Sequence, residues 1–223
     1  MNQEKTLNIC LVRHGETEEN LARILQGHLP GTLTENGKQQ TVSLRTQLNI
    51  KKFDVIISSD LKRVTDTVEI LLDGNDIAWK KSATLREIDW GSMTGMKIEG
   101  TDFKQLAKDV ETREMLYERA KQVANDLLEK YVGKTILVVS HGLFLRSLIA
   151  NLTNVPIHQL HTIKHMKNCE ARWLTIKHIP KFTKNETRSQ SSRNIKSRSF
   201  RTLDDLTHAY GYIDQDIQRE QHY

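Results

Sequence analysis

The 223-residue chain has little cysteine and no long apolar run. Its two cysteines, Cys10 and Cys169, have no spacing that suits a metal ion, so a reduced compartment is the economical interpretation. The apolar window at 7–12 is interrupted by Asn8 and is too short for the core of a signal peptide. No run approaches the ~18 apolar residues of a membrane-spanning helix. We therefore expect a cytoplasmic protein that does not associate with membranes.

The net charge of +5 is too small to indicate a nucleic-acid-binding protein, but it is unevenly distributed. Residues 181–201 hold seven Lys/Arg against one acidic residue, and residues 202–223 hold one Arg against five Asp/Glu. The first stretch predicts a flexible basic linker. Nucleic-acid binding is not expected there, because Phe200 is nearly its only aromatic residue.

Residues 202–223 predict an amphipathic helix that begins at Thr202. Its apolar side chains recur at alternating spacings of three and four: Leu203, Leu206, Tyr210, Ile213 and Ile217. Two docking positions are open for this helix, the active-site rim of the same chain or a second subunit in a homodimer. The globular domain itself is expected to span residues 1–180.

Three short runs rich in β-branched residues predict strands at 7–12, 53–57 and 135–139. A helical segment follows each run. The first is capped by Thr34 and ends near Leu48, the second has cap candidates in Ser58-Ser59-Asp60, and the third follows Ser140-His141-Gly142. Residues 102–131 read as one long helical region, and a last strand is expected at 170–177. Strands that alternate with helices indicate an α/β fold with a largely parallel sheet.

Two of the predicted strands end in the same way. "VRHG" follows the first run and "SHG" follows the third, so His14 and His141 each stand at a strand end with glycine next. In open α/β sheets, ligands bind outside the carboxyl ends of the strands, where helix N-termini also point. Glycine lets the backbone approach a ligand closely, which is the role we expect for Gly15. The pair predicts one crevice that holds both histidines.

Arg63 lies about one turn into the helix after the strand at 53–57, at the same edge of the sheet. Together with Arg13, His14 and His141 it would form a compact cationic cluster. Such a cluster is repulsive unless an anion neutralises it. The planar fork of arginine suits phosphate oxygens, so the sequence favours a phosphoryl group over a diffuse acidic surface.

At these residues the chain resembles the histidine phosphatase superfamily, also called the phosphoglycerate mutase-like family. The resemblance rests on motifs that occur in the family's order: "RHGETEEN" (13–20), "QG" (26–27), "LTENG" (33–37), "SSDLKRVTDT" (58–67), "LREIDWG" (85–91) with Gly95, "SHG" (140–142) and "NCEARWLTI" (168–176). It implies a three-layer α/β/α sandwich with a mostly parallel central sheet, in which His14 becomes transiently phosphorylated.

The resemblance and the chemistry suggest the same roles. His14 attacks phosphorus as a neutral ring, and by family analogy its other nitrogen binds a backbone carbonyl in the Gly15 turn. Arg13, Arg63 and His141 hold the phosphoryl oxygens. Asn20 is expected to donate a hydrogen bond to the phosphoryl group, because this position contacts it in the family. Gly142, which follows His141, is expected to lie at the substrate.

These motifs do not identify the substrate, but they indicate where it is selected. The loop at Gln26 and Gly27, with residues 92–115, is expected to line the specificity pocket. We expect no metal ion and no cofactor, because the arginines neutralise the phosphoryl charge.

The leaving group needs a proton, and the family's donor position corresponds to Glu87 in "LREIDWG". The same carboxylate can accept a proton from water in the second half-reaction. Asp89 is its nearest rival, and the further candidates are Glu16, Glu18 and Glu19.

The expected activity is hydrolysis of small phosphate monoesters, such as sugar phosphates or glycolytic acids. Only 54 positions separate Glu87 from His141, and the donor motif reads "EIDWG". The glycolytic mutases of the family carry a longer insertion between these two positions and a donor motif similar to "ERHYG". These departures favour the phosphatase branch. Two alternatives are a bisphosphoglycerate-dependent phosphoglycerate mutase and a weakly catalytic sensor of phosphorylated ligands. A metal site at His158, His161 and His165 is disfavoured, because spacing alone is weak evidence.

Overall fold

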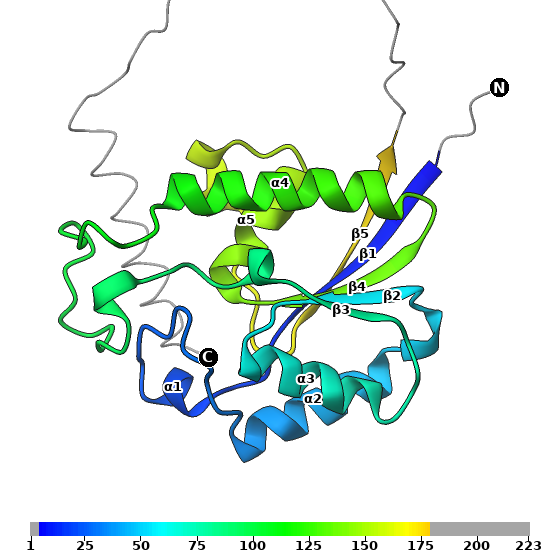
Figure 1. Ribbon diagram of the computed structural model, residues 1–223, viewed down its shortest axis with the longest axis horizontal. Coiled ribbons are helices and arrows are strands. Elements are labelled where there is room, and N and C mark those ends of the chain that lie inside the picture. The colour runs from blue at the N-terminus through cyan, green and yellow to red at the C-terminus, as the bar shows by residue number, and fades with distance from the viewer. Residues whose placement is uncertain (1–4, 179–223) are drawn as a thin grey trace, which may run out of the picture.

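The predicted apolar runs become the central strands of one five-stranded sheet in the computed structural model, which describes residues 5–178 (Figure 1). Its strands and α-helices, in chain order, are β1 (Lys5–Arg13), α1 (Glu18–Leu21), α2 (Glu35–Gln47), β2 (Val55–Ser58), α3 (Lys62–Leu72), β3 (Trp79–Lys81), α4 (Arg113–Tyr131), β4 (Thr135–Ser140), α5 (Gly142–Leu152) and β5 (Ala171–His178). The predicted linker at 181–201 and the predicted helix at 202–223 lie outside the described residues.

The sheet has the strand order β3-β2-β4-β1-β5. Strands β1 and β4 pair in parallel, as do β2 and β4 and also β2 and β3, and β5 runs antiparallel to β1 at the edge. The predicted α/β class with a mostly parallel sheet is therefore confirmed. Parallel neighbours end at the same edge of a sheet, so the residues after β1, β2 and β4 are delivered to one place.

Helices α4 and α5 cover one face of the sheet, and α2 and α3 cover the other, which confirms the three layers (Figure 1). Strand side chains alternate between two cores because successive residues point to opposite faces. In β1, Leu7, Ile9 and Leu11 enter the core under α4 and α5, whereas Cys10 and Val12 enter the core under α2 and α3. Burial on both faces is why these strands read as continuous apolar runs.

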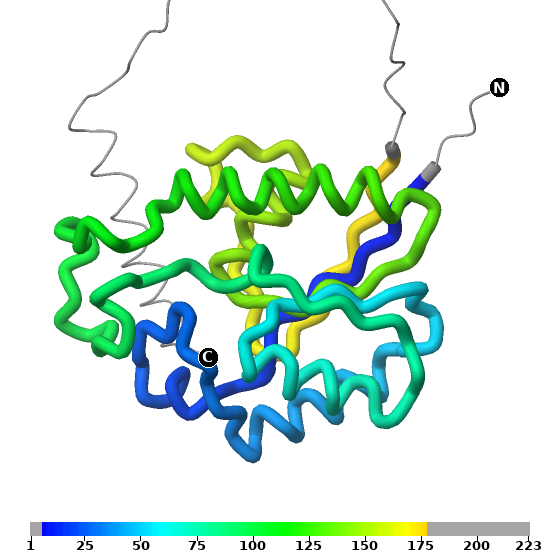
Figure 2. Tube along the Cα trace, viewed as in Figure 1, coloured from blue at the N-terminus to red at the C-terminus, as the bar shows by residue number. Residues whose placement is uncertain are grey.

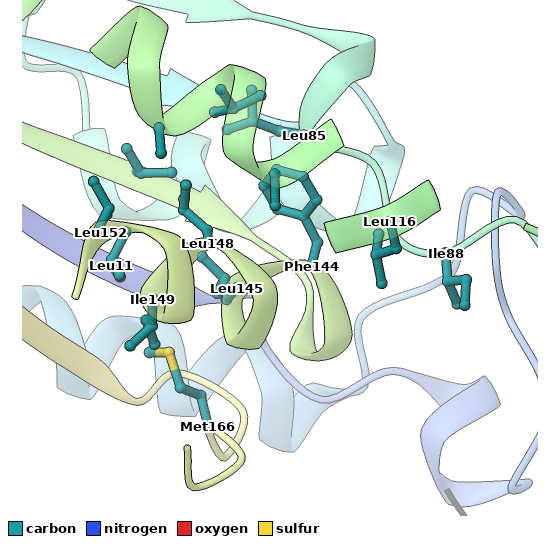
Figure 3. Close-up of a cluster of buried hydrophobic side chains, with 14 of the residues drawn as sticks. Leu11, Leu85, Ile88, Leu116, Phe144, Leu145, Leu148, Ile149, Leu152 and Met166 are labelled. Atoms are coloured by element: carbon teal, nitrogen blue, oxygen red, sulfur yellow. The ribbon is translucent and has the colours of Figure 1, made fainter. Parts of the chain in front are cut away.

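The larger core is dominated by α5, which follows β4 directly. Figure 3 shows side chains of this helix packed beside Leu11 of β1 and Leu116 of α4; those labelled are Phe144, Leu145, Leu148, Ile149 and Leu152. The same core extends to Leu85 and Ile88, in the segment between β3 and α4. Dense packing on this side fixes the start of α5 and the 85–88 segment relative to each other.

The long connections gather at one end of the sheet. Figure 2 shows the segment after β1 (blue) and the segment between β3 and α4 (green) at the end away from Lys5. They touch through an antiparallel bridge between Ile24 and Lys97, with the Leu25 amide donating to the Met96 carbonyl at 2.9 Å. The carboxyl ends of β1 and β4 therefore lie at the end of the sheet where these loops gather.

The structure corrects the long helix expected at 102–131. Helix α4 begins at Arg113, capped by the Thr112 hydroxyl, which accepts from the Met115 amide. In the preceding segment aspartate side chains bind backbone amides instead, Asp102 that of Lys104 and Asp109 that of Ser92. The bond within 102–104 is local and competes with helix formation, whereas the Asp109 bond ties the segment to residues 17 positions earlier.

Two smaller expectations at the second strand were also incomplete. Helix α3 has Leu61 as its N-cap with no side-chain cap bond, so the cap proposed within 58–60 is wrong. Asp60 instead forms a two-bond ion pair with Arg86, at 2.6 and 2.7 Å. The three-residue strand β3 was not predicted, because it is too short to show a period. The N-cap predicted at Thr34 is confirmed, since its hydroxyl accepts from the Gly37 amide at 2.8 Å.

Across the described range 5–178, none of the helices has the length and apolar character needed to cross a membrane.

Candidate active site

His14 and His141 meet at the carboxyl ends of adjacent strands. Parallel pairing of β1 with β4 sets Arg13 opposite Ser140, the last residue of each strand. The next residue in each case is a histidine, so the two histidines are neighbours. The two imidazole rings lie edge to face with centroids 5.3 Å apart, and both side chains are buried. The two strand ends therefore bring the histidines together, as expected.

His14 is held in a single tautomer. Its Nδ1 lies 2.7 Å from the Gly15 carbonyl oxygen, and a carbonyl can only accept, so Nδ1 carries the proton. In the neutral ring Nε2 then keeps its lone pair. Burial, and after it the charges of Arg63 and Arg13, lower the pKa of His14 well below its ordinary value. His14 is therefore neutral at neutral pH, as an attacking nitrogen must be.

Gly15 has a packing task besides the one expected. A Cβ atom there would lie 2.7 Å from the Gly37 carbonyl oxygen, and one at Gly37 would lie 2.1 Å from the Glu16 carbonyl oxygen. The two glycines let the strand end and the start of α2 pack backbone to backbone. The contact anchors the turn whose carbonyl orients His14. Close approach of an anion to Gly15 remains a prediction.

Arg63 reaches the site from the first turn of α3 and is 1% exposed. Its guanidinium donates to the Gly27 carbonyl at 2.9 Å and also to the Leu29 carbonyl. Burial lowers its pKa to about 10, against the raising effect of the nearby charges of Glu87 and Glu19. Arg63 thus remains a cation at neutral pH, and two carbonyls fix its direction.

Arg13 closes the cluster from the end of β1. Its guanidinium donates to the Met166 carbonyl at 2.8 Å. Gly142, the first residue of α5, lies against this group, since a Cβ at Gly142 would be 3.5 Å from the guanidinium carbon. Arg13 is 9% exposed, so the two arginines form a largely dry cationic pair around the histidines.

His141 is oriented by a residue that the sequence argument treated only as a helix cap. Its Nε2 lies 2.8 Å from the hydroxyl of Ser59, which is buried and follows β2. Its buried Nδ1 has no hydrogen-bond partner within residues 5–178. Burial, followed by the charges of Arg63, His14 and Arg13, lowers the pKa of His141 well below its ordinary value. A bound anion would oppose these effects and supply a partner for a protonated ring.

The Glu87 side chain lies at the N-terminus of α5, the helix that begins directly after His141. Its carboxylate accepts hydrogen bonds from the backbone amides of Leu143 and Phe144, at 3.1 and 3.0 Å. It also accepts one from the amide of the next residue, Ile88, at 3.0 Å. It is the nearby acid with the largest effect on Arg63. The structure thus brings this carboxylate to the cluster, as the motif position suggested, and three backbone donors hold it there.

The rival carboxylates are engaged elsewhere. Glu16 accepts from the Thr34 hydroxyl at 2.8 Å and from Asn36, and Glu18 is exposed. Glu19 accepts from the Thr32 amide at 3.1 Å, and Asp89 accepts from the Gly91 amide at 2.9 Å. Of the five carboxylates, Glu87 is the one bound to the start of the helix that follows His141.

Asn20 is connected to the strand end through Asn168. The side-chain oxygen of Asn20 accepts from the Thr17 amide at 3.2 Å and from the Asn168 amide nitrogen at 3.4 Å, which leaves the Asn20 amide nitrogen as a donor for an anion. Asn168 also donates to the His14 carbonyl at 3.0 Å. Its place in "NCEARWLTI" signalled the closing strand but gave no hint of this link.

Gln26 and Gly27, expected to line the specificity pocket, lie in the loop that orients Arg63. Gln26 is buried, and its side-chain oxygen has no hydrogen-bond partner among the described residues. Gly27 has a positive φ of 47° and offers its carbonyl to Arg63. Contact of Gln26 and Gly27 with substrate remains a prediction.

The three spaced histidines do not form a shared site. His165 lies 2.7 Å from the Arg146 guanidinium, and His158 lies beside the Gln159 amide. Within residues 5–178, no group of three or more His, Cys, Asp or Glu side chains is arranged to hold a metal ion.

Comparison with known proteins decides what this arrangement belongs to. The sequence profile described as the histidine phosphatase superfamily (branch 1) matches residues 9–184. The chain belongs to the histidine phosphatase superfamily. That membership confirms the resemblance carried by the motifs, and with the phosphatases among its relatives it supports a phosphoric monoester hydrolase.

Relatives of this histidine phosphatase include a phosphatase and a probable phosphoglycerate mutase, the two activities considered above. It is 29% identical over 177 residues to the adenosylcobalamin/alpha-ribazole phosphatase of Salmonella typhimurium, covering 73% of this chain and 88% of the relative. It is 31% identical over 193 residues to a probable phosphoglycerate mutase, GpmB, of Salmonella arizonae, covering 75% and 88%. The structure of phosphoserine phosphatase from Entamoeba histolytica with 3-phosphoglyceric acid superposes with a TM-score of 0.66 at 27% identity, over 75% of this chain and 89% of that one.

Proposed function

We propose that this protein hydrolyses small phosphate monoesters, such as sugar phosphates or glycolytic acids, through a phosphorylated His14. The observation that carries the proposal is the state of the His14 ring. Its Nδ1 proton is fixed on the Gly15 carbonyl and burial between two arginines keeps the ring neutral, so Nε2 is a ready nucleophile.

In the first half-reaction, Nε2 of His14 attacks phosphorus and the bond from phosphorus to the ester oxygen breaks. The electron pair of that bond goes to the leaving oxygen, which takes a proton from the Glu87 carboxyl group. Arg13, Arg63 and protonated His141 bind the phosphoryl oxygens and stabilise the charge spread over them.

In the second half-reaction, water gives a proton to the Glu87 carboxylate and its oxygen attacks phosphorus. The bond from phosphorus to Nε2 breaks, and its electron pair returns to the ring. The products are an alcohol and inorganic phosphate, and Glu87 is again ready to donate.

The reaction as proposed needs no metal ion. Two buried guanidinium groups supply the positive charge that a divalent cation supplies in other phosphoryl-transfer sites. Activity with p-nitrophenyl phosphate should therefore persist in EDTA.

The nucleophile is tested with His14→Ala. The substitution should lower p-nitrophenyl phosphate hydrolysis by at least about 10³-fold, because the covalent step is lost. His158→Ala is the control, since His158 is exposed and removed from the cluster. Trapping of acid-labile, base-stable radioactive phosphate on wild type but not on His14→Ala would show the intermediate. Substantial turnover by His14→Ala would refute the mechanism.

The proton donor is tested with Glu87→Gln. An alkyl phosphate should lose about 10²- to 10⁴-fold in kcat, and p-nitrophenyl phosphate much less, because a good leaving group needs little acid assistance. Asp89→Asn is the matched control at the rival carboxylate. Equal losses on both esters for Glu87→Gln, or the selective loss in Asp89→Asn instead, would move the role away from Glu87.

A second candidate function is phosphoglycerate mutase activity, which the likeness to GpmB favours. An assay with 3-phosphoglycerate and bisphosphoglycerate that measures phosphate release and phosphate transfer together separates the two activities. Release in excess of transfer supports the phosphatase, and the reverse supports the mutase. Binding of phosphate esters with neither outcome would instead support a sensor.

A further inference from the structure

Arg119, in the middle of α4, faces the segment that carries Glu87. Its guanidinium donates to three backbone carbonyls of that segment, those of Thr84, Arg86 and Glu87, at 2.9, 2.8 and 3.2 Å. It also forms two bonds to Glu111, at 2.9 and 2.7 Å. An arginine that donates to three carbonyls within four residues of a loop fixes the path of that loop.

We propose that Arg119 and Glu111 are a positioning pair that holds Glu87 for proton transfer. The inference rests on the function proposed above and assigns neither residue a contact with substrate. It concerns the accuracy with which one carboxylate is placed.

Glu111 extends the hold to the far side of Glu87. Its carboxylate accepts the Asp89 amide at 3.1 Å, and its own amide donates to the Asp89 carbonyl at 2.8 Å. The pair therefore binds the chain immediately before and after Glu87. Glu111 is 12% exposed at its side chain and Arg119 is 22% exposed, so the ion pair is largely shielded from water.

Arg119 also touches the surface that receives the Glu87 carboxylate. Its guanidinium carbon lies 5.1 Å from the ring centre of Phe144, in cation–π geometry. The Phe144 amide is one of the donors that hold the Glu87 carboxylate. One guanidinium thus connects the backbone of the donor segment with the helix end on which its side chain rests.

The other side of the segment is bound to the Arg63 loop. His28 donates from Nε2 to the Glu87 carbonyl at 3.0 Å, and its neighbours Gly27 and Leu29 supply the carbonyls that orient Arg63. Movement of the donor segment would therefore disturb the acid before it disturbed the nucleophile, which is anchored separately through Gly15 and Gly37.

The test is Arg119→Lys, which keeps the charge but not the fork that reaches three carbonyls. A displacement of the acid by about 1 Å costs on the order of 10²-fold. We expect an alkyl phosphate to lose about 10- to 100-fold in kcat, with KM little changed and p-nitrophenyl phosphate within about threefold of wild type. Glu111→Gln should show the same selective loss.

Arg45→Lys is the matched control. Arg45 also bonds one carbonyl, that of Ile70, and one carboxylate, that of Asp73, but on the opposite face of the sheet. It should leave the ratio of the two activities at the wild-type value even if the protein loses stability.

The double variant Glu87→Gln with Arg119→Lys decides whether Arg119 acts through Glu87. If it does, Arg119→Lys adds less than about twofold in the Glu87→Gln background, because the acid it positions is already absent. An equal loss on both esters, or a full additional loss in that background, would overturn the inference. Failure of the proposed function would be visible independently, as activity in His14→Ala or no leaving-group effect in Glu87→Gln itself.

Discussion

Acidification should destabilise this protein through His14 and His141. Both rings are at least 97% buried, with 3% and 0% exposure, and both pKa values lie well below the ordinary histidine value. In the unfolded chain the same rings titrate near pH 6.5. The unfolded state therefore binds more protons below that pH, so stability is present above pH 6.5 and is lost as the pH falls through it.

The size of the effect follows from proton linkage. Between pH 7.5 and 5.5, each histidine that stays neutral in the folded protein costs about 1.4 kcal/mol of unfolding free energy, and the pair costs about 2.7 kcal/mol. Other groups titrate in this window too, so the measurement has to compare variants. His14→Gln and His141→Gln should each reduce the loss by about 1.4 kcal/mol.

Urea unfolding followed by circular dichroism at the two pH values provides the measurement. His158→Gln serves as the control, because His158 is exposed and lies outside the cluster. If His14→Gln and His141→Gln lost as much stability on acidification as wild type, the rings would be charged in the folded protein. The neutral nucleophile would then be refuted.

Three further predictions concern residues that support the cluster. Ser59→Ala should lower kcat by about tenfold and destabilise by about 1–3 kcal/mol, because His141 Nε2 loses its buried partner; steady-state kinetics and urea unfolding measure both. Gly37→Ala should cost at least about 1–3 kcal/mol in urea unfolding, since its Cβ would lie 2.1 Å from a carbonyl oxygen, and an unchanged midpoint would show that the backbones can separate. Asn168→Ala should weaken product inhibition by inorganic phosphate about fivefold, because Asn20 loses an orienting bond; an unchanged inhibition constant would show that Asn20 holds its position without it.

Much of the fold was predictable because its signals are local. The strand at 7–12 is apolar on both faces, and Leu11 and Val12 do enter opposite cores. Thr34 announces α2 because its hydroxyl caps the helix within the same turn. Residues 102–112 misled because their apolar spacing reflects burial of Phe103 and Val110 from a loop, in which the Asp102 side chain binds the Lys104 amide.

The residues that orient the site escaped the sequence argument because their partners are distant in the chain. Ser59 meets a ring 82 positions away, and Arg119 reaches carbonyls 32 to 35 positions before it. Each looks like an ordinary helix or cap residue until the sheet order is known. The packing role of Gly15 was missed for the same reason, since the backbone that excludes its Cβ belongs to Gly37.

The sequence by itself determined which groups meet. Arg13, His14 and His141 follow runs that can only be buried strands, and parallel strands end at a common edge, so their convergence needs only the strand direction. The tertiary structure alone decided how these groups are held. Charge state and direction depend on Ser59, Asn168, Arg119 and the Gly15–Gly37 contact, because a buried polar group takes its state from whatever packing brings within hydrogen-bond distance.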